Sequence, residues 1–412
     1  MSENHEVSTS ENSRKRRQSH AVSVTEVEMP LIPHEATSIG GGENDNGALV
    51  ASDKVHSLPE LSEDIMFQIL SRLPVEPVFR FQCVCKLWKQ HLSSPIFAEK
   101  HHLSPYQPCD TFAIVSLSSG SFFLRELTAP NACATLRYLR LNSVDGGPKQ
   151  LACSHGMVCY RTEDENKDIF VCNPVTQEFI VLPYIEDYEF EIQGLYFNRL
   201  NYSFKVLVWC WPTGSIRRGL WMFSSETERW KRISLGMQVF IYGGRFICVG
   251  SVLYQLGEHA VYTFDMEREE WGSIRVPPGV SGKSCCMMEW DGRVCLVQEP
   301  KRFELVIWRL SETIWEKGTT LCLEKRFYRR GSYPHVRDLG IVGHRGCLFV
   351  ARVVRRTVEV TSYDIDGNKR DIKWRFCSND KLNEDFSLKI FPFTPTLLQF
   401  RTITATHVQT SS

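Results

Sequence analysis

The most regular pattern of hydrophobic positions in the chain lies between residues 61 and 97. Its first stretch repeats apolar residues near the 3.6-residue period of an α-helix, at Leu61, Ile65, Ile69, Leu70 and Leu73. Ser62, followed by Glu63 and Asp64, suits the start of such a helix, and Leu73-Pro74 stops it. The pattern therefore predicts one amphipathic helix between Ser62 and Leu73.

Two further apolar stripes follow. The second contains Val78, Phe81, Val84 and Cys85, and the third pairs Trp88 with Leu92. We expect Ser93-Ser94-Pro95 to end the unit, which predicts three helices in the 38 residues from Leu58 to Pro95. A segment of this size buries too little apolar surface to be stable alone, and no disulfide or metal pattern supplements it. Another molecule is therefore expected to cover part of its apolar surface.

From about Asp110 onward the pattern changes to short β-branched and aromatic runs separated by turn residues, which predicts an all-β architecture. Three segments repeat one layout: an apolar strand with an aromatic residue near its end, a polar turn, and then tryptophan. The aromatic pairs are Phe223 with Trp230, Phe264 with Trp271, and Trp308 with Trp315. Successive copies begin 41 and 44 residues apart. Two weaker copies flank them, at Ile169–Phe179 and Ser362–Trp374.

A glycine followed by a short apolar strand precedes most copies, as in HGMVCY from His155, GSVLYQL from Gly250, DGRVCLV from Asp291 and RGCLFV from Arg345. We expect these strands to be the inner strands of the repeats, where packing around an axis favours small residues. Units of 40 to 50 residues with several strands are typical of β-propellers. Residues 105–400 accommodate six or seven such blades, with the aromatic pairs packed mostly blade against blade. The run Lys389–Thr404 is expected to close the ring by pairing with Thr111–Leu117.

The helical stretch from Leu58 to Phe97 resembles an F-box, most closely in CVCKLW and SSPIF. F-boxes are short motifs by which substrate receptors dock on the Skp adaptor of cullin–RING ubiquitin ligases. The resemblance implies that eight residues serve the F-box core and the adaptor interface: Leu61, Ile65, Ile69, Leu70, Leu73, Pro74, Val84 and Trp88. Ser62 stands where the family often has proline, and Glu76-Pro77 replaces a more usual Lys-Ser. Both departures are compatible with the motif, because serine is a good N-cap and proline is tolerated in a first helical turn.

Residues from about 150 to 320 resemble the F-box-associated domain of a large family of plant F-box proteins, itself related to kelch-type propellers. The resemblance rests on CSHGMVCY, VCNPVTQEFIVLP, GLYFNRLNYSFKVLV, VYTFDMEREEWGSIRVPP, and WDGRVCLV followed by LVIW. It implies the substrate-recognition subunit of a Skp–cullin–F-box ubiquitin ligase, with the adaptor, cullin, RING subunit and an unknown protein substrate as partners. Two alternatives stay open: a Skp-bound scaffold that does not direct degradation, and a propeller lectin or enzyme whose helical segment is incidental.

Loops at the blade ends are where substrate contacts are expected. Arginine and aromatic residues are enriched at interface hot spots, and the best candidates are Trp211, Arg217, Arg218, Phe327, Arg329 and Arg330. An acidic or phosphorylated target segment would pair with such arginines. Ordinary surface decoration explains the basic doublets at least as well.

Composition and motifs bear on other functions. The 48 basic and 48 acidic side chains balance, so no global attraction to nucleic acid or membrane is expected. No run approaches eighteen apolar residues and the N-terminus lacks an apolar signal core, which argues against membrane spans and secretion. The fifteen scattered cysteines predict buried thiols in a reducing compartment rather than disulfides or a metal site. We expect neither catalysis nor a cofactor, because no nucleophile elbow, phosphate loop or zinc helix occurs.

Residues 1–55 contain no phenylalanine, tyrosine or tryptophan, which predicts a disordered tail. Within it Arg14, Lys15, Arg16 and Arg17 form either a nuclear import signal or a solvated charge run. The chain is expected in the nucleus, the cytoplasm or both. The predicted organisation is an α+β multi-domain protein: the tail (1–55), a three-helix F-box (56–102), an all-β propeller-type domain of six or seven blades (103–405) and a disordered C-terminus (406–412).

Overall fold

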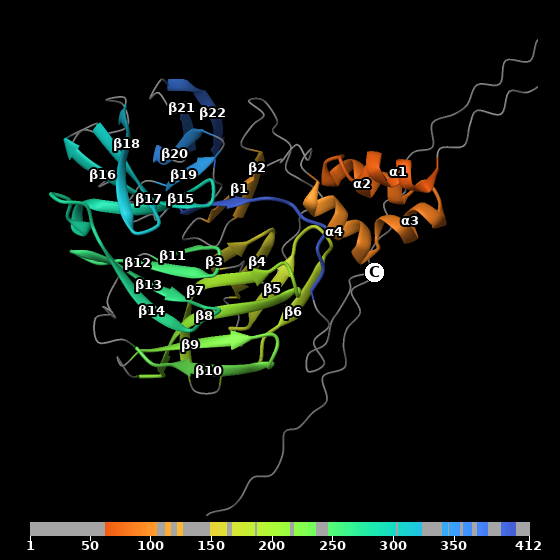
Figure 1. The fold of residues 1–412 in the computed structure, drawn as a ribbon, viewed down its shortest axis with the longest axis horizontal. Coiled ribbons are helices and arrows are strands. Elements are labelled where there is room, and N and C mark those ends of the chain that lie inside the picture. Colours follow the sequence, from red (N-terminus) through yellow and green to blue (C-terminus); the bar gives the residue numbers. More distant parts are fainter. Residues whose placement is uncertain are drawn as a thin grey trace, which may run out of the picture. The chain divides into compact units, whose positions relative to one another are not determined.

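The computed structural model describes residues 62–104, 112–116, 122–126, 149–162, 167–185, 188–214, 218–235, 246–301, 304–323, 340–344, 346–354, 357–364, 369–377 and 389–400. These residues belong to one compact unit, Leu61–Ser412. A helical segment is followed by a β-rich domain, as predicted (Figure 1). The expected disordered tail, its basic cluster and the C-terminal residues 406–412 lie outside the described residues.

The helical segment contains four described helices rather than three: α1 (Glu63–Leu70), α2 (Val75–Gln82), α3 (Lys86–Leu92) and α4 (Pro95–Leu103). The expected end of the unit at Ser93-Ser94-Pro95 was wrong: Ser93 ends α3, but Ser94 and Pro95 begin α4. Ser94 Oγ accepts a hydrogen bond from the Phe97 N–H at 3.2 Å, which makes Ser94 an N-cap. Pro95 occupies the first helical turn, where its missing N–H leaves no hydrogen bond unmade.

A proline also separates the first two helices. Pro74 is the N-cap residue of α2, and α1 ends at Leu70 with Ser71 as its C-cap. Pro77 lies in the first turn of α2, where the helix tolerates it as expected. None of the helices in the described part of the chain has the length and hydrophobicity needed to cross a membrane.

His101 of α4 is almost completely buried and ties this helix to the segment after α1. Its Nε2 lies 2.9 Å from the Leu73 carbonyl oxygen, a hydrogen bond in which the ring N–H donates. Burial lowers the pKa of His101 from 6.5 to about 4, and the neighbouring His102 contributes in the same direction. The folded helical segment therefore holds a neutral histidine at neutral pH.

The fold should consequently lose stability in mild acid. Below about pH 6.5 the unfolded chain binds a proton that folded His101 rejects, so the free energy of unfolding falls by up to about 1.4 kcal/mol per pH unit until about pH 4. His101→Gln keeps an N–H donor but does not titrate, so its unfolding free energy should fall less steeply. Denaturant unfolding of both proteins at pH 7, 6 and 5 measures the two slopes. Equal slopes would show that His101 is not the group responsible.

The β strands form five sheets in the described part of the chain. Three of them are four-stranded antiparallel sheets built from consecutive strands: β3 (Lys149–Ser154), β4 (Met157–Arg161), β5 (Ile169–Asn173) and β6 (Glu178–Val181); β7 (Tyr188–Asn198), β8 (Ser203–Pro212), β9 (Gly219–Ser224) and β10 (Arg229–Ile233); β11 (Phe246–Val249), β12 (Val252–Leu256), β13 (Ala260–Asp265) and β14 (Glu270–Arg275).

A fourth sheet joins two such meanders through the single parallel pair of Trp290 with Gly343. Its strands are β15 (Cys285–Trp290), β16 (Arg293–Lys301), β17 (Glu304–Ser311) and β18 (Ile314–Cys322), then β19 (Gly340–His344), β20 (Cys347–Val354), β21 (Thr357–Asp364) and β22 (Lys369–Cys377). The 3₁₀ turn η1 (Gly282–Ser284) precedes β15. The fifth sheet contains β1 (Phe112–Ser116), β2 (Phe122–Glu126) and β23 (Lys389–Phe393).

The strands near the axis follow one another around a closed ring. β3 lies next to β7, and the order continues through β11, β15, β19 and β23 back to β3. β23 pairs antiparallel with β1, with Ile114 opposite Phe391. This confirms the expected pairing of the C-terminal run with the first β segment over Lys389–Phe393. Apolar side chains pack between neighbouring sheets, as Trp209 and Met222 do with Leu253 and Phe264.

The glycine-preceded strands are not the inner strands that the sequence pattern suggested. HGMVCY contains β4, and the other three copies contain β12, β16 and β20, each the second strand of its meander. The glycines serve the hairpin turns between first and second strands. Gly156 and Gly292 have φ of +81° and +75°, and the preceding His155 and Asp291 also have positive φ. Two consecutive residues of positive φ are what a type I′ hairpin turn requires, and glycine adopts this conformation without strain.

The repeated tryptophans connect neighbouring sheets by hydrogen bonds as well as by packing. Three indole N–H groups donate to carbonyl oxygens of the preceding meander or the segment that follows it: Trp230 to Pro183 at 2.8 Å, Trp271 to Ser234 at 2.9 Å and Trp315 to Arg275 at 2.8 Å. Phe264 and Trp271 face each other across β13 and β14 with ring centroids 4.7 Å apart. The blade-to-blade role of these tryptophans is thereby confirmed.

The third aromatic pair does not match the first two. Trp315 lies opposite Leu310 rather than Trp308, which faces Lys317 instead. The turn between β17 and β18 has only two residues, Glu312 and Thr313, whereas four residues separate β13 from β14. The shorter turn moves the register, so equal spacing in the sequence does not give an equal pair in space.

Asn173 at the end of β5 holds a segment from the far end of the chain. Its side chain is fully buried, and its Nδ2 donates to the carbonyl oxygens of Thr396 at 3.0 Å and Leu398 at 2.7 Å. Its Oδ1 accepts from the Val175 N–H at 2.9 Å. Every polar atom of the side chain therefore has a partner, as burial demands. The amide joins the first meander to the residues directly after β23.

Candidate partner-binding site

Helix α1 carries apolar side chains on two faces. Leu70 is buried, and Met66 and Phe67 pack against the same core. Ile65 and Ile69 lie four residues apart, therefore on one face, and Ile69 is 50% exposed. Large apolar side chains left in water at helical spacing form a surface that a partner can cover.

A second exposed apolar pair lies around the start of α3. Val84 is 62% exposed, and Leu87 is about half exposed. Beside them Trp88 is only partly exposed, because its ring packs against Phe81 with centroids 5.5 Å apart. The Trp88 N–H donates to Cys85 Sγ, which caps α3. Trp88 therefore contributes to the packing of the helical segment itself.

The eight residues implied by the F-box resemblance fall into distinct environments. Ile65, Ile69 and Val84 are exposed; Leu73, Pro74 and Trp88 are half-buried; Leu70 is buried; and Leu61 lies outside the described residues. Leu70 packs in the core, in keeping with a shared role in core and interface. The exposed members are the ones that a partner can contact without unfolding the segment. Adaptor contact by any of the eight stays a prediction.

The sequence pattern missed exposed apolar residues on α4 and α3. Ile96 is 77% exposed and Leu103 is 69% exposed. Together with α1 they line an open groove of about 530 Å³, to which Arg72 and Lys100 also contribute. The residues escaped notice because the unit was expected to end at Pro95. Leu87 was missed because it falls between the second stripe, which ends at Cys85, and the third, which begins at Trp88.

Of the proposed substrate residues, the structure brings two together. The Arg218 guanidinium lies over the Trp211 ring, 4.5 Å from its centroid, and its Nη1 is 3.6 Å from Glu191 Oε2. Arg218 is thus engaged within the chain by a cation–π contact and an ion pair. The other four, Arg217, Phe327, Arg329 and Arg330, lie outside the described residues.

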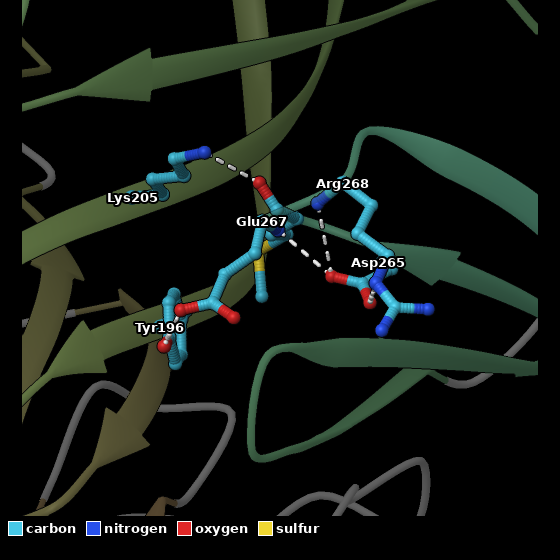
Figure 2. Close-up of polar contacts among 6 residues, drawn as sticks. Tyr196, Lys205, Asp265, Glu267 and Arg268 are labelled. Carbon is cyan, nitrogen blue, oxygen red and sulfur yellow. Dashed lines mark hydrogen bonds and ion pairs between the residues drawn. The ribbon is translucent and has the colours of Figure 1, made fainter.

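A cluster of tyrosine, lysine and carboxylate side chains connects the second and third meanders (Figure 2). Asp265 Oδ1 accepts the Glu267 N–H at 2.8 Å and Lys205 Nζ donates to the Met266 carbonyl at 2.6 Å. Tyr196 donates to the Glu267 carboxylate, and burial together with this hydrogen bond raises the pKa of Tyr196. These contacts hold the turn between β13 and β14 against β7 and β8, so the cluster serves the packing of the sheets.

Metal binding finds no support in the described part of the chain, where no three histidine, cysteine or carboxylate side chains come together as ligands. The described cysteines form no disulfides, although Cys83, Cys85 and Cys322 are exposed rather than buried. Burial raises the pKa of thiols such as Cys172, so these groups stay protonated at neutral pH.

Comparison with known families gives two matches. The model of the F-box domain matches residues 58–100. The model of the F-box associated beta propeller domain matches residues 128–389, which is more than half of the chain.

Curated relatives carry the same description. An F-box protein of Arabidopsis thaliana is 23% identical over 280 residues, which cover 59% of this chain and 87% of the relative. A putative F-box protein of the same plant is 25% identical over 302 residues, covering 65% of this chain and 74% of the relative. Among solved structures, a chain of a nidogen/laminin complex matches with a TM-score of 0.39 and 11% identity, covering 68% of this chain and 98% of that chain. That likeness is too distant to bear on function.

Proposed function

Because the chain belongs to the plant F-box proteins that carry an F-box associated beta propeller domain, we propose that it is the substrate-recognition subunit of a Skp–cullin–F-box ubiquitin ligase. The F-box docks on a Skp-type adaptor, which connects it through cullin to the RING subunit. The β domain binds a protein substrate. Proximity to the charged conjugating enzyme then raises the effective concentration of substrate lysines, so the chain itself needs no catalytic residue.

The observation that carries this proposal is the exposure of Ile65, Ile69 and Val84 on the F-box. Full burial of one such side chain contributes about 1.5 to 3 kcal/mol, so an adaptor that covers several of them gains substantial binding energy. The half-buried Leu73 and Trp88 support the exposed residues from the core side. Docking then supplies the covering molecule that a helical segment of this size needs.

For the β domain we propose six blades. The supporting observation is the ring of six first strands, β3, β7, β11, β15, β19 and β23, each of which begins an antiparallel meander. β23 takes the first place in its blade and β1 and β2 follow it, so the two ends of the domain share one sheet. Such a closed ring holds its connecting loops on a rigid frame, which suits substrate recognition.

We place substrate contact at the loops that contain the two arginine doublets. Arg218 and Trp211 already form a cation–π pair beside Glu191. A carboxylate or phosphate of the substrate would compete with Glu191 for the Arg218 guanidinium, and bidentate pairing with arginine favours such anions. Arg217, Phe327, Arg329 and Arg330 complete the proposed contact set.

Blocking cullin activity distinguishes the receptor from a Skp-bound scaffold. Proteins that bind the β domain should be identified first, and their abundance followed in cells that express or lack the chain. For a receptor, loss of the chain and loss of cullin activity each lengthen the half-life of a bound protein, and the two effects are not additive. An unchanged half-life for every bound protein would favour the scaffold.

A further inference from the structure

A cavity of about 610 Å³ lies at the axis of the β domain. The first strand of every meander contributes to its wall, including Cys153 of β3, Cys248 of β11 and Glu289 of β15. Its volume falls in the range of small-molecule sites in proteins. The cavity is independent of the exposed F-box residues that support adaptor docking.

The wall offers both hydrogen-bonding groups and apolar surface. β3, β7 and β11 are edge strands, so each pairs with only one neighbouring strand of its own sheet. Edge strands carry backbone N–H and C=O groups that are available to a further partner. Ile247, Met287 and Ile341 add apolar side chains from three different strands. A ligand with one polar end and an apolar body fits this combination.

The charge of the wall is negative. Among the described residues that line the cavity there is no lysine or arginine, whereas two glutamates, Glu191 and Glu289, belong to the lining. Glu191 forms an ion pair with Arg218 at 3.6 Å. Glu289 is partly buried, accepts a hydrogen bond from the Gly292 N–H, and has another acid, Asp291, as its charged neighbour. Glu289 is therefore a carboxylate with no lysine or arginine among the described lining residues to pair with it.

We propose that this cavity binds a small organic cation, an amine or quaternary ammonium group on an apolar body, with the Glu289 carboxylate as the counter-charge. The partly buried position of Glu289 strengthens such a pair relative to one in water. The thiols around it, Cys153 and Cys248, have raised pKa values and remain neutral, so they neither compete for the cation nor add to its binding as thiolates. An anion of the same size meets an uncompensated carboxylate and is rejected.

Three compounds with the same kind of apolar phenylalkyl chain test which charge the cavity prefers. They differ in the polar end group, which is cationic, neutral or anionic: 4-phenylbutylamine, 4-phenylbutanol and 4-phenylbutyrate. Calorimetric titration of the full-length protein near pH 7.5 is expected to rank the amine first, at least about tenfold tighter than the alcohol, and the acid last. Glu289→Gln should reduce amine affinity to about that of the alcohol and leave alcohol binding unchanged. Glu316→Gln on the exposed part of β18 is the matched control and should change neither.

The pH dependence of amine affinity gives a second test, on the unaltered protein. Burial, with Asp291 acting in the same direction, raises the pKa of Glu289 to about 6. Only about one tenth of the carboxylate is ionised at pH 5, so amine affinity should fall about tenfold between pH 7.5 and 5 while the amine stays charged. Among the described residues, the other titratable groups near Glu289 or in the wall are Cys153, Cys248, Cys286, Asp291, Glu191, His102 and His155. The pKa of His155 is lowered to about 4, so this ring stays mostly neutral over the same range.

The proposal is overturned if the amine shows no saturable binding up to about 10 mM, or if the acid binds as tightly as the amine. It is also overturned if Glu289→Gln, folded by circular dichroism, binds the amine as tightly as the unaltered protein does. A Glu289→Gln protein that fails to fold leaves the pH dependence of the unaltered protein as the decisive measurement. An amine affinity that is equal at pH 7.5 and 5 then rejects Glu289 as the counter-charge.

Discussion

Asn173→Ala should lower the free energy of unfolding by about 3 kcal/mol, the largest stability effect expected for a single polar residue here. The substitution removes two hydrogen bonds donated to the Thr396 and Leu398 carbonyls, and two accepted from the Val175 and Thr176 N–H groups. The first three of these bonds are buried. The two carbonyl oxygens are then left buried without that donor. Because the lost bonds join the first meander to the segment after β23, the closure of the ring weakens with them.

Urea unfolding of the full-length protein, followed by circular dichroism, measures this effect. Asn201→Ala is the matched control, since Asn201 makes the same kind of turn, accepting the Ser203 N–H at 3.1 Å, but is exposed and donates to Glu226. It should cost no more than about 1 kcal/mol. If both variants lost the same free energy of unfolding, the Asn173 hydrogen bonds to Thr396 and Leu398 would not be a major source of stability.

Ile69→Asp is expected to weaken binding to a Skp-type adaptor at least about 100-fold, which corresponds to roughly 2.7 kcal/mol. A charge placed at an apolar contact loses the burial energy of the isoleucine and adds the cost of removing a carboxylate from water. Since Ile69 is 50% exposed in the chain alone, the F-box should remain folded. The effect then reports on the interface rather than on folding.

Ile314→Asp controls for the substitution itself. Ile314 begins β18 in the β domain and is 69% exposed, so the same change is made on a surface that the proposal does not use. Surface plasmon resonance with immobilised adaptor compares both variants with the unaltered protein. Undiminished binding by folded Ile69→Asp would remove α1 from the proposed interface. Leu73→Asp is a poorer test, because Leu73 is half-buried against the F-box core.

The helices show how far local pattern carries a prediction. Hydrophobic spacing located α1 and the stripes of α2 and α3, because an amphipathic helix needs its apolar residues on one side. The same reasoning stopped too early at Ser93-Ser94-Pro95. Serine followed by proline is compatible both with the end of one helix and with the cap and first turn of the next. The choice between them depends on Phe97 and Ala98, which pack in the F-box core.

The β domain shows where local pattern stops. Repeat spacing predicted a propeller-type domain and identified the tryptophans that join its sheets. It did not identify the inner strands, because the position of a strand within a meander depends on which distant strand it meets. The hydrogen bonds of Asn173 could not be predicted for the same reason, since their acceptors lie 223 and 225 residues away in the sequence. Residues that are separated in this way are brought together only by closing the ring.

The resemblance to F-boxes predicted eight core and interface residues, and the structure shows which of the described ones are exposed to solvent. Ile65, Ile69 and Val84 became the residues that a partner can reach, while Leu70 became a core residue. Periodicity alone does not make this distinction, because an exposed isoleucine and a buried leucine can follow the same spacing. The cavity around Glu289 had no signal in the sequence, since its wall takes residues from six separate strands.

Complex formation with a purified plant Skp-type adaptor tests the central claim most directly. Size-exclusion chromatography with light scattering should show one peak with the mass of one chain plus one adaptor, and Ile69→Asp should elute separately from the adaptor. Two separate peaks from the folded, unaltered chain and a folded adaptor would contradict the receptor proposal. The β domain would then have to be studied as a binding module that works without the ligase.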